Sequence, residues 1–183
     1  SKVSIFSGLN NLVDISLYPQ YGNICGYTQT DLETSFQPYL LGVDMEKVKR
    51  WYDGYNFLKD NVYNPFDILK FCANGHLYKN YWFESGSPSF LINLIKEKNY
   101  YMPKLENISI DEDMLDVFDI EHINFEVMLY QSGYLTIKKP IARGLIFQLG
   151  YPNEEVRFGF LHELLPLYSS LTRSNIDIVV LEL

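Results

Sequence analysis

The segment from Trp51 to Leu69 constrains the fold of this chain more than any other. It begins with Trp51-Tyr52-Asp53-Gly54-Tyr55, so large aromatic side chains crowd around one acid and one glycine. The side chain of Asn64 can cap a helix, and Pro65 suits the first helical position because no amide donor is needed there. Asp67 then falls in the positively polarised first turn of that helix. The sequence therefore predicts an aromatic corner between two helices.

Apolar residues recur at helical spacing through most of the first hundred residues. Capping residues and glycines mark the expected helix ends. Pro38 should end the regular part of the first helix, and Tyr81-Trp82-Phe83 is expected to be a short extended or buried segment. The predicted helices run from about Thr28 to Leu41, from Asp44 to Gly54, from Asn64 to Gly75 and from Ser87 to Lys98.

The second part of the chain changes from helical to alternating periodicity. Ser109 to Glu112 has the form of a capping box and predicts a short helix with Met114, Leu115 and Phe118. Residues from Ile120 to Tyr130 predict a second helix. Alternating residues then predict a β-hairpin over 135–149, followed by a long helix over 153–171 and a strand-like tail over 176–183. The expected fold class is mostly α with a small antiparallel β-hairpin (α+β).

A polar stretch from Asn99 to Asn107 is the best candidate for a boundary between two regions, 1–100 and 101–183. In the second region, two short helices, a hairpin and a packing helix have the outline of a winged-helix module. Lys138, Lys139 and Arg143 in the hairpin either contact phosphate or form a solvated face.

Composition excludes several classes of protein. The chain has 15 basic and 23 acidic residues, a net charge of −8 and a pI of about 4.8, which argues against nonspecific nucleic-acid binding. Cys25 and Cys72 are far apart and fit two thiols in a reducing compartment. The sequence contains neither a long apolar run nor a signal peptide, so we expect no membrane contact and a cytoplasmic location.

The sequence carries no catalytic motif that we could identify. It lacks a Gly-x-x-x-x-Gly-Lys phosphate loop, and its three histidines are scattered without metal-ligand spacing. Asp177 and Glu182 lack the lysine that a PD-(D/E)xK nuclease needs. Asp53 is either an acid with a raised pKa or a turn residue that accepts backbone N–H groups beside Gly54. We therefore predict no catalytic residue, no metal site and no cofactor in this chain alone.

Several motifs, in order, resemble a family of predicted AAA-type ATPases of Bacteroidetes and other anaerobic bacteria. Members of this family often carry a PD-(D/E)xK nuclease-like domain at the C-terminus. The resemblance extends to about Leu171, and the tail 172–183 departs from the family pattern. The matching segments are Ser4 to Leu12, Trp51 to Tyr55, Val62 to Pro65, Tyr81-Trp82, Ser132 to Thr136 and Gly150 to Arg157.

This resemblance implies a helical lid followed by a winged-helix-like module. The ATP- and Mg-binding core of the parent would lie upstream and the nuclease-like domain downstream, and both would be partners of this segment. Arg50 and Arg157 lie in matched motifs and are candidates for contact with nucleotide, although a surface salt bridge is an alternative for each. The other residues singled out by the motifs are Trp51, Tyr52, Asp53, Tyr55, Asn64 and Trp82.

The leading hypothesis is a non-catalytic segment that couples nucleotide state to a partner or an appended domain. The alternative is a stand-alone module that binds another protein through an aromatic surface around Trp51, Tyr55 and Trp82. DNA contact through the hairpin is a further, less favoured alternative.

Overall fold

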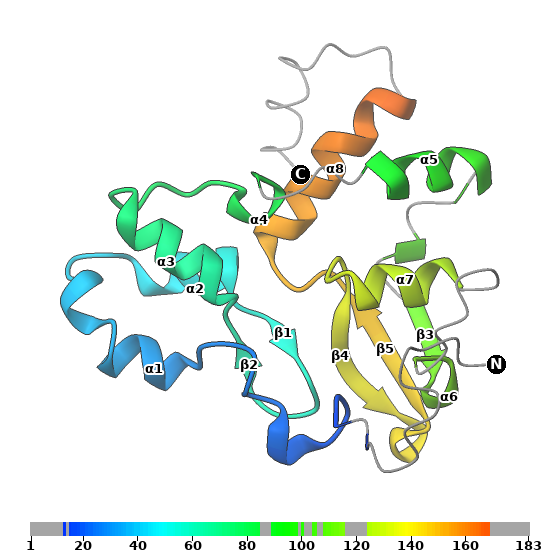
Figure 1. Cartoon of the computed structure of the whole chain (residues 1–183), viewed down its shortest axis with the longest axis horizontal. Helices are drawn as coiled ribbons and strands as arrows, with labels where there is room; N and C mark the ends of the chain where they lie inside the picture. The colour runs from blue at the N-terminus through cyan, green and yellow to red at the C-terminus, as the bar shows by residue number, and fades with distance from the viewer. Residues whose placement is uncertain are drawn as a thin grey trace.

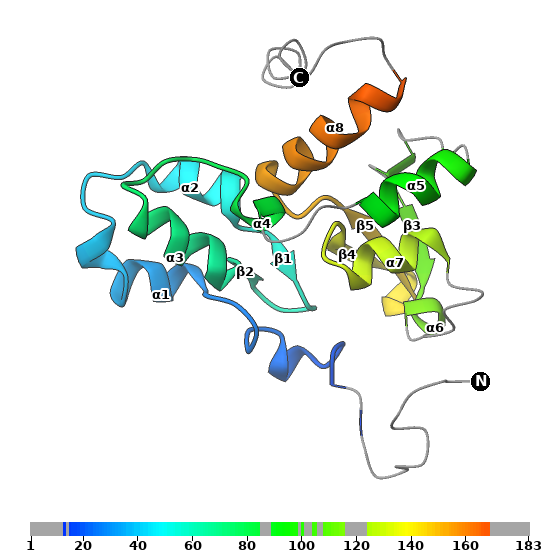
Figure 2. The same ribbon diagram turned by 45° about the horizontal axis from the view of Figure 1, so that its top comes forward.

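The structure is a computed structural model that describes residues 13, 15–84, 89–98, 100, 104–105, 108–115 and 124–168. It confirms the α+β fold class, with short helices and two small antiparallel sheets. Figure 1 shows the N-terminal helices on one side, the larger sheet on the other, and the last helix, α8, reaching across the top between them. Figure 2 shows the same arrangement after a 45° turn.

The N-terminal half is helical apart from one very short antiparallel strand pair. Side chains of Thr28, Asp44 and Asn64 accept backbone N–H groups at the starts of α1, α2 and α3, as their sequence positions predict. In order, the elements are the 3-10 helix Pro19–Tyr21, α1 Gln29–Thr34, the 3-10 helix Gln37–Tyr39, α2 Met45–Tyr52, β1 Tyr55–Asn56, β2 Asn61–Val62, α3 Pro65–Ala73 and α4 Tyr81–Glu84.

The C-terminal half places a three-stranded sheet among helices. The strands pair antiparallel in the order β3-β5-β4, so the last strand lies between the other two. The side chain of Asn153 caps α8 by accepting the backbone N–H of Val156 at 3.0 Å. In order, the elements are α5 Ser89–Lys98, β3 Ile108–Asp111, α6 Glu112–Leu115, α7 Phe125–Gln131, β4 Thr136–Ile141, a 3-10 turn Ala142–Gly144, β5 Ile146–Gly150 and α8 Glu154–Tyr168.

One local prediction is wrong. The capping-box segment from Ser109 to Asp111 belongs to strand β3, because Ile108 and Ile110 alternate with exposed residues and pair with β5; the helix begins only at Glu112. Here tertiary packing overrides a weak local signal. Of the two alternatives for Tyr81-Trp82-Phe83, the segment is not extended, since it forms the short helix α4, but its Tyr81 is buried.

Other predicted boundaries shift or lie outside the described residues. The first helix ends at Thr34, and a 3-10 turn containing Pro38 follows, as the proline indicates. The described part of the last helix runs from Glu154 to Tyr168. The predicted positions Phe118, Ile120 and Ile123, the Ser87-Pro88 cap, residues 169–171, the tail 172–183 and the Ser4 to Leu12 motif lie outside the described residues.

Two hydrophobic clusters form the core. The N-terminal cluster contains Leu32, Leu40, Val48, Tyr52, Tyr63, Ile68, Phe71 and Tyr81. The C-terminal cluster contains side chains from α5, the three-stranded sheet, α7 and α8. The clusters therefore divide the chain between Tyr81 and Leu91, while a domain boundary near residue 100 stays a prediction. Helix α8 contacts α2 and α4 as well as α5, so it connects both clusters.

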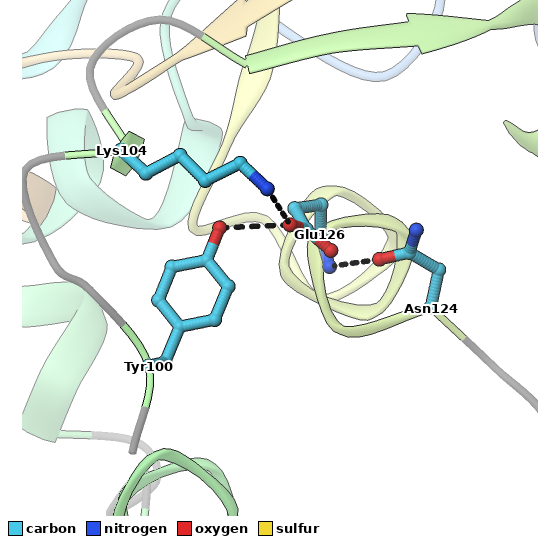
Figure 3. A network of polar contacts seen from close by, with 4 residues as sticks. All are labelled: Tyr100, Lys104, Asn124 and Glu126. Atoms are coloured by element: carbon cyan, nitrogen blue, oxygen red, sulfur yellow. Dashed lines mark hydrogen bonds and ion pairs between the residues drawn. The ribbon is translucent and has the colours of Figure 1, made fainter. Parts of the chain in front are cut away.

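Polar contacts of Glu126 connect Tyr100 and Lys104 to helix α7 of the C-terminal cluster (Figure 3). Its Oε1 accepts a hydrogen bond from the Tyr100 hydroxyl at 2.8 Å and lies 3.4 Å from Nζ of Lys104. The side chain of Asn124 accepts the backbone N–H of Glu126 at 2.9 Å, which caps α7. The Glu126 carboxylate is only 9% exposed, so these donors compensate for its loss of water.

Removing the cap of α3 should destabilise the N-terminal cluster. Asn64→Ala removes the oxygen that accepts the N–H of Phe66 at 3.0 Å. We expect a loss of about 1 kcal/mol in the free energy of unfolding, which corresponds to a fall of about 2–4 °C in melting temperature for a chain of this size. The matched control is Asn93→Ala on the exposed face of α5, which should not lower the melting temperature. Equal effects of the two substitutions in thermal unfolding would contradict the capping role.

Candidate functional site

The sequence motifs that lie within the described residues meet between the two hydrophobic clusters. We call this region the motif junction. Its members contact each other although up to about a hundred residues separate them along the chain. It consists of the motifs 51–55, 62–65, 81–82, 132–136 and 150–157, together with Asn56 and Asp67, which contact them.

The backbones at Gly54 and Pro152 approach each other closely in the junction. A Cβ atom on Gly54 would overlap the carbonyl oxygen of Pro152, and the φ of +125° at Gly54 also favours glycine. Glycine is therefore needed at this position for two independent reasons. This contact brings the end of α2 against the connection between β5 and α8.

Three hydrogen bonds continue this contact along β1. The Tyr55 hydroxyl donates to the carbonyl of Gly133 at 3.2 Å. The Thr136 hydroxyl accepts the backbone N–H of Asn56 at 2.8 Å and donates to the Asn56 carbonyl at 3.3 Å. Burial raises the pKa of the Tyr55 hydroxyl, so this group stays a neutral donor. The motif Ser132 to Thr136 thus binds the motif Trp51 to Tyr55 directly.

Trp82 connects the junction to both α8 and the start of β4. Its ring packs edge-on against Tyr134, with centroids 4.7 Å apart, and it lies close enough to Gly133 to crowd any side chain there. Its backbone N–H donates to Oε1 of Glu155 at 2.9 Å. In addition, the ring of Phe83 fills the space beside Gly159 of α8, where a Cβ atom would clash.

Tyr52 is buried and Trp51 is half-buried. The Trp51 ring lies 5.4 Å from that of Phe158 of α8, and the Tyr52 hydroxyl donates to the carbonyl of Lys79 at 3.1 Å. Trp51, Tyr55 and Trp82 contact partners within the chain but keep part of their surface exposed. An aromatic surface that binds another protein therefore stays a prediction.

Asp53 is buried, and its environment contains both a backbone donor and cations. Burial raises the pKa of its carboxyl, while the N–H of Gly54 and the ammonium groups of Lys49 and Lys138 oppose that shift. The Gly54 contact agrees with the turn role inferred from sequence. Lys138 in turn donates to the carbonyl of Pro152 at 3.1 Å. Lys138, Lys139 and Arg143 of the predicted basic hairpin face are all exposed, although the Lys138 ammonium group also reaches the junction.

Asp67 and Glu155 form a buried carboxyl pair that sequence reasoning missed. Both side chains are 0% exposed, and the two carboxyl groups contact each other between α3 and α8. Burial raises the pKa of each, and the proximity of Asp67 raises that of Glu155 further. Both residues lie in the first turn of their helices, a position that for an acid predicts a solvated interaction with the helix dipole. The sequence shows nothing that identifies them as partners.

Arg50 and Arg157, the candidates for nucleotide contact, lie beside the junction on α2 and α8. The Arg50 side chain is 59% exposed and lies 3.9 Å from Glu154, a distance typical of a weak surface ion pair. Arg157 follows Glu154 by one helical turn and lies over the Phe158 ring. The fold therefore brings both arginines to the same part of the α2–α8 contact.

Two pockets lie on either side of Tyr55. One of about 340 Å³ is lined by Leu17, Phe57, Tyr130 and Thr136 among others. The other, of about 230 Å³, is lined by residues that include Asn64, Trp82 and Gly133. The junction is thus hollowed around its central tyrosine.

Within the described ranges, no group of three or more His, Cys, Asp or Glu side chains is arranged to hold a metal ion. Among the helices that the structure describes, none combines the length and apolar character that crossing a bilayer requires.

Comparison with known proteins gives one informative similarity. The uncharacterized protein in the vnfD 5' region of Azotobacter chroococcum mcd 1 is 42% identical to this chain over 170 residues. The match covers 92% of this chain but 33% of the relative, so the chain spans about a third of the length of that curated relative. No protein-family model and no solved structure matches the chain.

Substitution of Gly54 should destabilise the junction far more than substitution of a glycine at a surface turn. Gly54→Ala forces a methyl group against the Pro152 carbonyl and strains the backbone, so we expect a loss on the order of 3 kcal/mol. Gly42 also has a positive φ, of +76°, but a Cβ atom added there would have no neighbouring atom within 4 Å. Gly42→Ala should therefore cost about 1 kcal/mol. Denaturant unfolding measures both, and equal losses would show that the contact with Pro152 is unimportant.

Proposed function

We propose that this chain is a non-catalytic, cytoplasmic segment of a larger AAA-type ATPase. In this proposal it comprises the helical lid and a winged-helix-like module, and it couples the nucleotide state of an upstream core to a partner or an appended nuclease-like domain. ATP and Mg would bind to the parent protein, with this segment contributing contacts.

The sequence motifs and the length of the relative support this proposal. The motifs that resemble the ATPase family are present in order, without a phosphate loop among them. A relative 42% identical over 170 residues is about three times as long as the matched region, which fits a segment of a multidomain protein.

The topology of the C-terminal half supports the winged-helix part. After α5 and strand β3 come the two short helices α6 and α7, and then the hairpin of β4 and β5. The second hairpin strand returns between β3 and β4. This order of helices and strands resembles the outline of a winged-helix module, in which the hairpin would form the wing.

The motif junction is the observation that carries the coupling proposal. Hydrogen bonds from Tyr55 and Asn56 reach residues 133 and 136, and the Gly54 backbone contacts Pro152. A movement of the N-terminal helices would therefore be transmitted to the hairpin and to α8. Coupling of this kind requires a packed contact with two arrangements whose balance a ligand shifts.

In the whole protein, ATP should change the protection of the junction from hydrogen exchange. We expect peptides covering 51–56, 132–136 and 150–157 to change together when ATP and Mg are added. Thr136→Val removes the hydroxyl that accepts the Asn56 N–H. It should leave ATP binding intact while reducing the response of peptide 132–136, as measured by exchange and mass spectrometry.

The control for this experiment is Thr30→Val, which changes an exposed threonine on α1. It should leave the exchange response unchanged. The coupling proposal fails if ATP changes none of the three peptides in a protein that binds it. The assignment as a non-catalytic segment fails if the isolated 183-residue chain binds and hydrolyses ATP.

The two junction arginines should affect nucleotide turnover in the whole protein. Arg50→Ala or Arg157→Ala should lower kcat by about tenfold or more if either side chain reaches the phosphates, because such contacts stabilise developing charge. Arg143→Ala at the hairpin tip provides an arginine control that should retain activity. If both junction variants hydrolyse ATP like the control, these arginines serve only in surface ion pairs.

A further inference from the structure

Three of the four carboxyl oxygens of Asp67 and Glu155 lack a hydrogen-bond donor among the described residues. The Glu155 carboxyl accepts the backbone N–H of Trp82 at 2.9 Å and also a backbone N–H of Tyr81. Among the described residues, no N–H or O–H group donates to Oε2 of Glu155 or to either carboxyl oxygen of Asp67. Both side chains are 0% exposed, so bulk water does not supply the missing donors. A proton on the pair itself is the donor that remains.

The electrostatic surroundings accommodate one negative charge but not two. Asp67 and Glu155 lie in the first turns of α3 and α8, whose N-terminal dipoles favour an anion. Two adjacent carboxylates in a buried site repel each other strongly, as in acid pairs that share one proton. Burial and mutual proximity accordingly raise the pKa of both groups.

The other titratable groups that face the pair are tyrosines. Among the described residues they are Tyr52 of α2 and Tyr55 of β1, whereas the Tyr81 hydroxyl donates to the carbonyl of Leu77. Burial raises the pKa of Tyr52 and Tyr55, so their hydroxyls stay neutral where carboxyl groups titrate. No lysine, arginine or histidine among the described residues shifts the pKa of either carboxyl group.

We infer that Asp67 and Glu155 share one proton and that this proton holds α3 against α4 and α8, so that its removal weakens the contact between the two clusters. Glu155 is also the residue whose other oxygen accepts the N–H at the start of α4. A change in its charge therefore acts on three helices at once. This inference uses only contacts within the chain and does not depend on the ATPase proposal.

The sign of the pH effect follows from the raised pKa values. A carboxyl group that binds its proton more tightly in the folded than in the unfolded chain stabilises the fold fully below its ordinary pKa, which is 4.5 for glutamate. That stabilisation is lost as pH rises toward the raised value. Over this interval the unfolding equilibrium constant rises about tenfold per pH unit for one proton.

Glu155→Gln is the sharpest variant, because it imitates the protonated pair. Its amide oxygen can accept the N–H of Trp82 while its NH₂ group donates to an ionised Asp67. We expect thermal or urea unfolding between about pH 5 and about pH 9 to lose the slope due to one proton. Glu154→Gln, on the same turn but with its side chain 40% exposed, is the matched control and should keep the slope of the parent chain.

Infrared spectroscopy of the parent chain detects the shared proton directly, and two variants assign the band. The parent chain at neutral pH should show the carbonyl stretch of a neutral carboxylic acid, and Glu155→Gln and Asp67→Asn should each abolish it. Absence of that band in the parent chain would overturn the inference even if a variant failed to fold. An unchanged unfolding slope in a folded Glu155→Gln variant would also overturn it.

Tryptophan fluorescence tests whether the proton controls the contact. The chain has two tryptophans, Trp51 and Trp82, and both lie in the junction. In a Trp51→Phe background, the emission of Trp82 should change with pH at the same midpoint as the infrared band, and Glu155→Gln should remove that change. A pH-independent emission while the infrared band titrates would show a shared proton that does not control the contact.

Discussion

The arrangement of this protein depends on one close contact between two backbones. Because Gly54 has no side chain, the end of α2 can approach the Pro152 carbonyl directly. That approach brings β1 within hydrogen-bonding distance of the start of β4. There the carbonyl of Gly133 accepts the Tyr55 hydroxyl, and the Thr136 hydroxyl oxygen accepts the backbone N–H of Asn56. A side chain at position 54 would separate these groups, and the neighbouring polar atoms would lose their partners together. The glycine thus determines a whole set of contacts.

Several acidic side chains are buried in this fold, and they are compensated in different ways. Glu126 receives a tyrosine hydroxyl and a lysine, while Asp53 receives a backbone N–H and lies near two lysines. Asp67 has neither kind of partner, while Glu155 accepts backbone N–H groups through one oxygen only; the two carboxyl groups face each other. An acidic chain with a net charge of −8 can therefore bury carboxyl groups without a matching number of basic residues.

The sequence predicts local features better than contacts between distant segments. The caps at Thr28, Asp44 and Asn64 follow from chemistry within a few residues, so they were predictable. Strand β3 was mistaken for a helix start because its identity depends on pairing with β5, about forty residues later. The Asp67–Glu155 pair was missed for the same reason, since each acid by itself is an ordinary first-turn residue. The motifs indicated where the junction lies but not which atoms meet there.

Because the chain is synthesised from its N-terminus, the contacts of the junction form late. The hydrogen bond between Asn56 and Thr136 spans 80 residues, and Glu155 lies 73 residues after Trp82. During synthesis the N-terminal cluster is complete long before these partners exist. Until residues 133–157 emerge from the ribosome, Trp82 and the Asp67 carboxyl face water, and Gly54 has no carbonyl against it. The nascent N-terminal half therefore exposes a partly apolar face, which α8 covers once it has formed.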